Sequence, residues 1–175
     1  DSGITFTPSA GTIRFTGSPT INQGGGNNFH NVTFAGGATA TLNSGMTVTE
    51  DLVIDSGDLD GSGRTITLAG NWVNNVGTGG YTHGGNGIVE LVNANKTSEL
   101  FGATNFSDLT VDGTATNTEG KNLELEVGTT FTVAGTLSLQ GENDADGDIY
   151  YVSLTSTSSG TQTELDVTGS ANLDY

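Results

Sequence analysis

The chain repeats one order of short, strand-like segments, and this repetition restricts the folds open to it more than any other feature. Residues 28–36 (NFHNVTFAG) align with residues 105–113 (NFSDLTVDG) at a shift of 77 residues. Flanking segments repeat in the same order at shifts of 76 to 85 residues: 11–15 with 87–91, 46–48 with 131–133, and 52–54 with 137–139. Internal repetition of short strands is typical of stacked β architectures, in which each unit contacts its neighbours. The repeat therefore predicts a shape before it predicts a function.

Apolar and polar residues alternate along most of the chain, which is the period-two pattern of β-strands. Turn-forming residues separate these segments: 28 of the 175 residues are Gly, and only 2 are Pro. The expected strands are Ile4–Phe6, Ile13–Phe15, Val32–Phe34, Ala38–Leu42, Met46–Val48, Leu52–Ile54, Ile66–Leu68, Trp72–Val73, Ile88–Val92, Leu109–Val111, Leu123–Val127, Phe131–Val133, Leu137–Leu139, Ile149–Leu154, Leu165–Val167 and Leu173–Tyr175. No segment keeps a 3.6-residue apolar period for the ~10 residues that a helix needs. The sequence therefore predicts an all-β protein.

Two all-β architectures compete for this pattern. A sandwich or jelly roll needs hairpins, closed by two-residue loops such as Asn-Gly or Asp-Gly. A solenoid needs very short strands joined by corners, with the aliphatic side chains of each coil stacked on those of the next. The short strands and the regular order of the repeat favour a parallel β-helix. At roughly 20 residues per coil it would have about eight or nine rungs and, at ~4.8 Å per stacked strand, a length of about 40 Å.

Residues 1–175 are expected to form a single segment of this kind, with two imperfect copies at about residues 11–86 and 87–170. The chain starts and stops in strand-like sequence, at Ile4–Phe6 and at Leu173–Tyr175. We therefore interpret it as a piece of a longer repeat protein.

Many positions outside the expected core are Asn, Thr or Ser. In a parallel stack, Asn side chains can hydrogen-bond their copies one coil away. Asn is also common in turns because it tolerates left-handed backbone conformations. Both explanations remain open from the sequence.

The charge of the chain excludes several classes of partner. Four Lys and Arg residues stand against 20 Asp and Glu residues, for a net charge of −16. Such a chain repels nucleic acid phosphates and anionic membranes, so neither is expected as a partner. No apolar run approaches the ~20 residues of a membrane span. The absence of Cys excludes disulfides and thiolate metal sites.

The sharpest local motif is the acidic segment 142–148 (ENDADGD). Asp144, Asp146 and Asp148 place carboxylates at alternate positions, with a Gly between the last two, as in loops that surround Ca²⁺ with oxygen ligands. The closing Glu at the twelfth position of such loops is replaced by Thr155. Bound Ca²⁺ would join rungs and would not be catalytic; the alternative is an acidic, solvated turn. A weaker relative of this motif lies at residues 55–61 (DSGDLDG).

A second candidate site is an aromatic segment between two pairs of glycines. Tyr81 and His83 lie between Gly79-Gly80 and Gly84-Gly85, which predicts a loop that projects from the rod. Sugar rings stack on aromatic faces, so Tyr81 and His83 are candidate ligand-binding residues, and Trp72 is conceivable as a further contact. The alternative for Trp72 is a place in the core of its strand.

No catalytic constellation is evident in the sequence, and we expect no enzyme. Some parallel β-helices cleave polysaccharides, so the fold by itself does not decide the question. Lyase chemistry of that kind needs a base beside Ca²⁺-bound carboxylates. The candidate bases are Arg14, Arg64, Lys96, Lys121, His30 and His83, none of them close in sequence to the acidic segment. A carbohydrate-binding or polysaccharide-degrading domain is therefore the alternative to a structural role.

Three segments resemble a known class of repeats when taken in order: GNWVNN at 70–75, GGNGIVEL at 84–91 and NFSDLTV at 105–111. This order resembles the β-helical repeat regions of large bacterial extracellular proteins, namely filamentous-haemagglutinin-like adhesins and autotransporter passengers. The resemblance covers most of residues 11–139, and its motifs are loose. It implies a right-handed parallel β-helix at the cell surface that acts as a stalk or an adhesive surface.

Together these observations predict a non-enzymatic segment of an extracellular surface protein, acting as an adhesin stalk or as a subunit of a cell-surface fibre. The expected partners are neighbouring rungs or identical subunits placed end to end, and host or matrix glycans. Ca²⁺ is the single cofactor that the sequence suggests.

Overall fold

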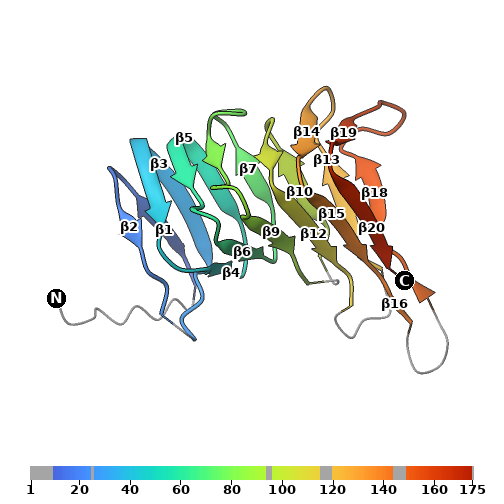
Figure 1. Ribbon diagram of the computed structural model, residues 1–175, viewed down its shortest axis with the longest axis horizontal. Coiled ribbons are helices and arrows are strands. Elements are labelled where there is room, and N and C mark those ends of the chain that lie inside the picture. Colours follow the sequence, from blue (N-terminus) through green and yellow to red (C-terminus); the bar gives the residue numbers. More distant parts are fainter. Residues whose placement is uncertain (1–9, 25, 94–95, 115–119, 144–148, 175) are drawn as a thin grey trace.

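The structure is a computed structural model that describes residues 10–24, 26–93, 96–114, 120–143 and 149–174 (Figure 1). These residues form strands and no helix, and so they contain no helix that is long and apolar enough to cross a membrane. The strands are β1 (Thr12–Phe15), β2 (Thr20–Ile21), β3 (Asn31–Leu42), β4 (Met46–Val48), β5 (Leu52–Asp60), β6 (Thr65–Leu68), β7 (Trp72–Asn74), β8 (Tyr81–Thr82), β9 (Ile88–Leu91), β10 (Ser98–Phe101), β11 (Asn105–Phe106), β12 (Asp108–Asp112), β13 (Asn122–Leu125), β14 (Thr130–Val133), β15 (Thr136–Gln140), β16 (Glu142–Asn143), β17 (Ile149–Tyr150), β18 (Ser153–Ser156), β19 (Glu164–Val167) and β20 (Ser170–Asp174). The predicted all-β fold is confirmed.

Three parallel sheets contain nearly all of these strands. The first sheet has the order β1-β3-β5-β7-β10-β13-β18, with β2 beside β3 and β8 beside β5. The second has the order β4-β6-β9-β12-β15-β20, and the third has the order β11-β14-β19. Every pairing within these sheets is parallel, and the antiparallel pair in the described residues is β16 with β17. Figure 1 shows the strands following one another along the long axis from the N-terminal to the C-terminal end.

The parallel pairing arises because the chain leaves a sheet after each strand and returns to it one circuit later. Strands β3 to β6 alternate between the first and second sheets. From β10 onward the chain visits the first, third and second sheets in that order, as β10, β11 and β12 and then as β13, β14 and β15. Parallel strands need such crossover connections, because a hairpin reverses the strand direction. The arrangement is consistent with the predicted parallel β-helix.

Side chains that face the interior lie in register from one strand to the next. In the first sheet the pairing aligns Val32, Leu52, Trp72, Leu100 and Leu125, all of which are buried. Two of these steps are 20 residues long, whereas the step from Trp72 to Leu100 is 28 residues, so the circuits lengthen along the chain. Each fully buried aliphatic or aromatic side chain contributes about 1.5–3 kcal/mol. These columns form one continuous apolar core.

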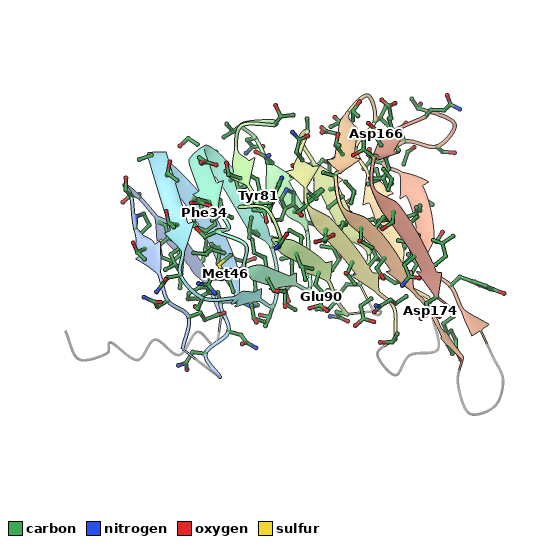
Figure 2. The ribbon with its side chains drawn as sticks, in the orientation of Figure 1. Phe34, Met46, Tyr81, Glu90, Asp166 and Asp174 are labelled. Carbon is green, nitrogen blue, oxygen red and sulfur yellow. The ribbon has the colours of Figure 1, made fainter. Side chains whose placement is uncertain are left out.

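A second interior column runs along the second sheet. It aligns Met46, Ile66, Val89, Leu109 and Leu137, and their outward neighbours are polar in most strands. In Figure 2 the side chains of Phe34, Met46 and Tyr81 lie within the ribbon, whereas those of Asp166 and Asp174 lie at its surface. The core therefore lies between the sheets.

Strands β3 and β5 are longer than the sequence suggests, because their pairing is interrupted at glycines and resumes beyond them. The glycines at 36–37 were expected to separate two strands, but β3 continues through them with a register shift relative to β5. A Cβ atom at Gly36 would collide with the backbone nitrogen of Gly17, and Gly57, with φ +90°, approaches the carbonyl oxygen of Ala38 equally closely. Glycine therefore permits the corner and the close backbone approach together.

The two copies found in the sequence do not occupy equivalent sheets. Strand β3 of the first copy lies in the first sheet, whereas its counterpart β12 lies in the second sheet. Likewise β4 lies in the second sheet, and its counterpart β14 lies in the third. An alternating pattern is the same for every sheet with one buried face, so the sequence match does not report which sheet a strand joins.

Polar side chains link successive circuits mainly through the backbone. The Asn31 side-chain oxygen accepts a hydrogen bond from the Asp51 N–H (3.0 Å), and Asp51 Oδ1 in turn accepts one from the Asn71 N–H (2.8 Å). A direct bond between amide side chains joins Asn43 Nδ2 to Asn22 Oδ1 at 2.8 Å. The circuits are therefore joined here chiefly by side-chain-to-backbone bonds, and the Asn22–Asn43 pair makes the amide-to-amide contact of an Asn ladder.

Candidate functional site

The strongest metal-binding candidates of the sequence, Asp144, Asp146 and Asp148, lie outside the described residues. The strands next to them form the antiparallel pair β16 and β17, in which Glu142 is opposite Tyr150. The Ca²⁺ site therefore stays a prediction from the sequence.

The weaker acidic motif at 55–61 does not form a loop. Most of it belongs to β5 (Leu52–Asp60), whose extended backbone pairs with β3. Asp55 Oδ2 lies 3.9 Å from an Arg14 guanidinium nitrogen. Partial burial, together with the neighbouring Asp60, raises the pKa of Asp58. An extended strand cannot curl around an ion, so this segment lacks the loop geometry that motivated the expectation of Ca²⁺ here.

Tyr81 lies in the core and not on a projecting loop. It belongs to β8, pairs with Leu59 of β5 and is 3% exposed. Its ring contacts Trp72 edge to face, with centroids 5.0 Å apart, and lies 6.2 Å from Phe106. Pairing with β5 thus outweighs the flexibility of the flanking glycines. The aromatic face expected to meet a sugar is covered by other rings.

The hydroxyl of Tyr81 is unusual within this core. Among the described residues, none hydrogen-bonds its Oη atom. Burial and then the nearby carboxylate of Asp60 raise the pKa of Tyr81, so the phenol stays protonated. The ring of Tyr81 therefore contributes to core packing, whereas its buried hydroxyl lacks a hydrogen bond from the described residues.

His83 and Trp72 are also held within the fold. His83 is half-buried, and its Nδ1 accepts a hydrogen bond from the Gly85 N–H at 3.1 Å. Trp72 is fully buried and donates from Nε1 to Thr104 Oγ1 at 3.1 Å. The expectation that Trp72 is a core residue is confirmed.

The sequence did not single out the buried ammonium of Lys121 as a structural element. Its Nζ donates to the carbonyl oxygens of Val92 (3.1 Å), Asn93 (3.1 Å) and Lys96 (2.8 Å), and to Ser98 Oγ (2.8 Å). Lys121 is fully buried, and this burial, followed by the positive charge of Lys96, lowers its pKa to about 8. The side chain holds together the two ends of the turn between β9 and β10.

An open groove on the outer face of the first sheet is a candidate binding site. The groove has a volume of about 510 Å³, and its lining includes Val73, Asn75, Val76, Phe101 and Glu126. Phe101 pairs with Val73 across β10 and β7. In β10 (SELF) the side chains of Ser98 and Leu100 face the interior, so that of Phe101 faces outward. An aromatic residue at an outward position was the signal in the sequence that could have indicated this groove.

The C-terminal end of the molecule presents a different surface. Strands β18, β19 and β20 each pair on one side within the described residues. Leu154 is 42% exposed and Leu173 is 57% exposed, although both continue interior columns, opposite Leu123 and Leu139. Leu173 also lines a small apolar cavity of about 170 Å³ beside Tyr151. This end therefore exposes core positions that another layer could cover.

Comparisons of the chain with protein-family models, with curated proteins and with solved structures found no match.

Proposed function

We propose that this chain is a non-enzymatic structural segment of an extracellular surface protein, built as a right-handed parallel β-helix. In this role it serves as an adhesin stalk or as a subunit of a cell-surface fibre. The observation that carries the proposal is the register of the interior columns, which continues through the seven strands of the first sheet. Each layer is covered by the next one, so the length of such a rod is set by the number of layers and not by a closed core.

In this proposal each strand on the path from β1 to β18 in the first sheet belongs to one coil. Later circuits are longer than the roughly 20 residues expected for a coil: 28 residues separate Trp72 from Leu100, and 31 separate Leu125 from Ser156.

The contacts of the basic residues support a structural role over catalysis. A base that abstracts a proton must reach its substrate. Five of the six basic residues considered for catalysis take part in contacts within the fold: Arg14 with Asp55, Lys96 with Glu50, Lys121 with three carbonyls and Ser98, His30 with Thr49, and His83 with Gly85. Apart from the local bond of His83, these contacts link segments that are 19 or more residues apart in the sequence.

The C-terminal end supports assembly along the rod axis, with an identical subunit or with further coils of a longer chain. Edge strands with unpaired backbone groups are templates for pairing with another strand. Leu154 and Leu173 add apolar side chains to that edge, and covering them would remove apolar surface from water at about 25 cal/mol per Å².

Assembly can be tested with variants that place a charge on the end or on the side of the rod. We expect light scattering and electron microscopy to show head-to-tail particles at high protein concentration. Leu173→Lys is expected to shift the population to monomers, whereas Thr110→Lys, which adds the same charge to the outer face of the second sheet, leaves assembly unchanged. A protein that stays monomeric at all concentrations would contradict end-to-end assembly.

A further inference from the structure

The outer face of the first sheet carries an apolar row that the core does not require. Val53, Val73 and Phe101 face outward in adjacent strands, in register, and all three are partly exposed. Val76, in the turn that follows β7, is 43% exposed beside them. On a chain with a net charge of −16, most other outward positions of this sheet are Asn, Asp, Glu or Thr. Val73 and Phe101 of this row, together with Val76, form the apolar floor of the groove.

One rim of the groove carries a carboxylate whose orientation is fixed. Glu126 Oε2 accepts hydrogen bonds from the Gly102 N–H (2.8 Å) and from Thr129 Oγ1 (2.9 Å). Both bonds are made to the same oxygen, and within the described part of the chain Oε1 accepts none. A carboxylate held through one oxygen presents the other to a ligand without further loss of side-chain freedom.

The opposite rim is also rigid. Asn74 is 1% exposed, its Nδ2 donates to the carbonyl oxygen of Gly77 (2.8 Å), and its Oδ1 accepts from the Val76 N–H (3.2 Å). These bonds fix the turn that carries Asn75, whose exposed side chain lines the groove. The two rims are thus formed before any ligand binds, which lowers the entropic cost of binding.

We propose that this groove binds a saccharide that carries a free amino group. The apolar floor of Val73 and Phe101 fits the C–H face of a sugar ring, and the aromatic ring also favours a nearby cation. Glu126 Oε1 accepts a charge-assisted hydrogen bond from the ammonium, and the Asn75 amide bonds a hydroxyl group. The site goes beyond the structural role proposed above and does not depend on it.

Charge and size support this class of ligand. Glu126 is the charged residue in the lining of the groove, and the net charge of −16 repels sugars that carry carboxylates, sulfates or phosphates. The volume of about 510 Å³ lies within the range of small-molecule sites, about 300–1,000 Å³.

Binding can be measured by titration calorimetry with glucosamine oligomers, and compared with N-acetylglucosamine oligomers of the same length. A pH of about 6 keeps the amine protonated, and physiological salt screens charges more than about 8 Å apart. We expect saturable binding of the amino sugar, and binding of the acetylated sugar weaker by about tenfold or more, which is about 1.4 kcal/mol. Equal affinities would overturn the role of the ammonium.

Two variants and a matched control locate the site. Glu126→Gln is expected to weaken binding of the amino sugar by about tenfold, and Phe101→Ala by about threefold. The control is Glu124→Gln, which removes the same charge from the outer face of β13 at a residue outside the groove lining, and it should leave the affinity within about twofold. Equal losses for both glutamate variants would show adsorption by net charge, and an unchanged affinity in Glu126→Gln would show that the ligand does not bind at this carboxylate; either result would overturn the proposal. Far-UV circular dichroism of each variant confirms that it is folded.

Discussion

The ammonium nitrogen of Lys121 lies 2.8 Å from Ser98 Oγ, inside the molecule and without contact with solvent. The same nitrogen holds three carbonyl oxygens from the turn that precedes β10. This turn lies where the circuits of the chain become longer, between Trp72 and Leu100. A charged side chain from the next circuit thus holds a longer connection in place.

Lys121→Met removes this ammonium while keeping a side chain of similar length. It relieves the desolvation of a buried charge, but it leaves the three carbonyl oxygens without a donor, at a cost of about 1–3 kcal/mol for each one that water does not reach. We expect the free energy of unfolding to fall by about 2 kcal/mol in urea denaturation. Lys96→Met, which removes the partly exposed ion pair with Glu50, is the control and should cost less than about 1 kcal/mol. Equal effects of the two substitutions would contradict the structural role of Lys121.

Stability should also depend on pH through Lys121. Its pKa is about 8 in the folded protein and 10.5 in the unfolded chain, because burial disfavours the charged form. Between these values the unfolded state binds more protons, so the stability contributed by this group rises with pH by up to about 3 kcal/mol. The contribution of Lys121 is measured by urea denaturation of the natural protein and of Lys121→Met at pH 7.5 and 9.5. The difference between the two proteins isolates Lys121, because they share all other titrating groups. Parallel pH profiles would show that the folded-state pKa is not lowered.

Gly102 allows a close approach of two backbones at the groove. Its φ is +76°, and a Cβ atom there would overlap the carbonyl oxygen of Asn74. We expect Gly102→Ala to destabilise the protein by about 3 kcal/mol or more. Gly128 has nearly the same φ, +75°, with open space around its Cβ position, so Gly128→Ala should cost only about 1 kcal/mol. Thermal denaturation of the two variants separates the steric effect from the backbone strain that they share.

Tyr81→Phe removes the hydroxyl that has no hydrogen-bond partner among the described residues. Because an unsatisfied buried polar atom costs about 1–3 kcal/mol, we expect this variant to be as stable as the natural protein or more stable by about 1 kcal/mol. Tyr81→Ala instead leaves a cavity beside Trp72 and should lose about 3–5 kcal/mol. A marked loss of stability in Tyr81→Phe would mean that the hydroxyl has a partner.

The acidic segment at 142–148 predicts stabilisation by Ca²⁺. If Ca²⁺ binds the folded state alone, a concentration one hundred times the dissociation constant adds about 2.7 kcal/mol to the free energy of unfolding. We expect the melting temperature to rise with Ca²⁺ and to return with a chelator. The same titration should have no effect on a variant in which Asp144, Asp146 and Asp148 are replaced by Asn. Equal melting temperatures in Ca²⁺ and in chelator would leave the segment as a solvated turn.

Much of the strand content could be predicted from alternation, and the exceptions have physical reasons. Strand β10 was missed because Ser98 takes an interior position and Phe101 an outward one, which inverts the usual pattern. The buried Ser98 is tolerated because its hydroxyl accepts a hydrogen bond from Lys121. At Tyr81, the glycines on both sides predicted a loop, but pairing with Leu59 places the ring in the core. Long-range pairing decided both cases.

The sequence by itself determined that the chain is all-β and that its strands are short, because alternation and turn residues are local properties. It also separated the buried aliphatic positions from the exposed polar ones in most strands. Only the tertiary structure decided which sheet each strand joins, since β3 and β12 share one pattern but lie in different sheets. The burial of Lys121 and the groove at Phe101 were decided there as well. Both depend on contacts between residues more than 20 positions apart, on neighbouring circuits. The alternation of residues within one strand does not predict which distant residues will meet.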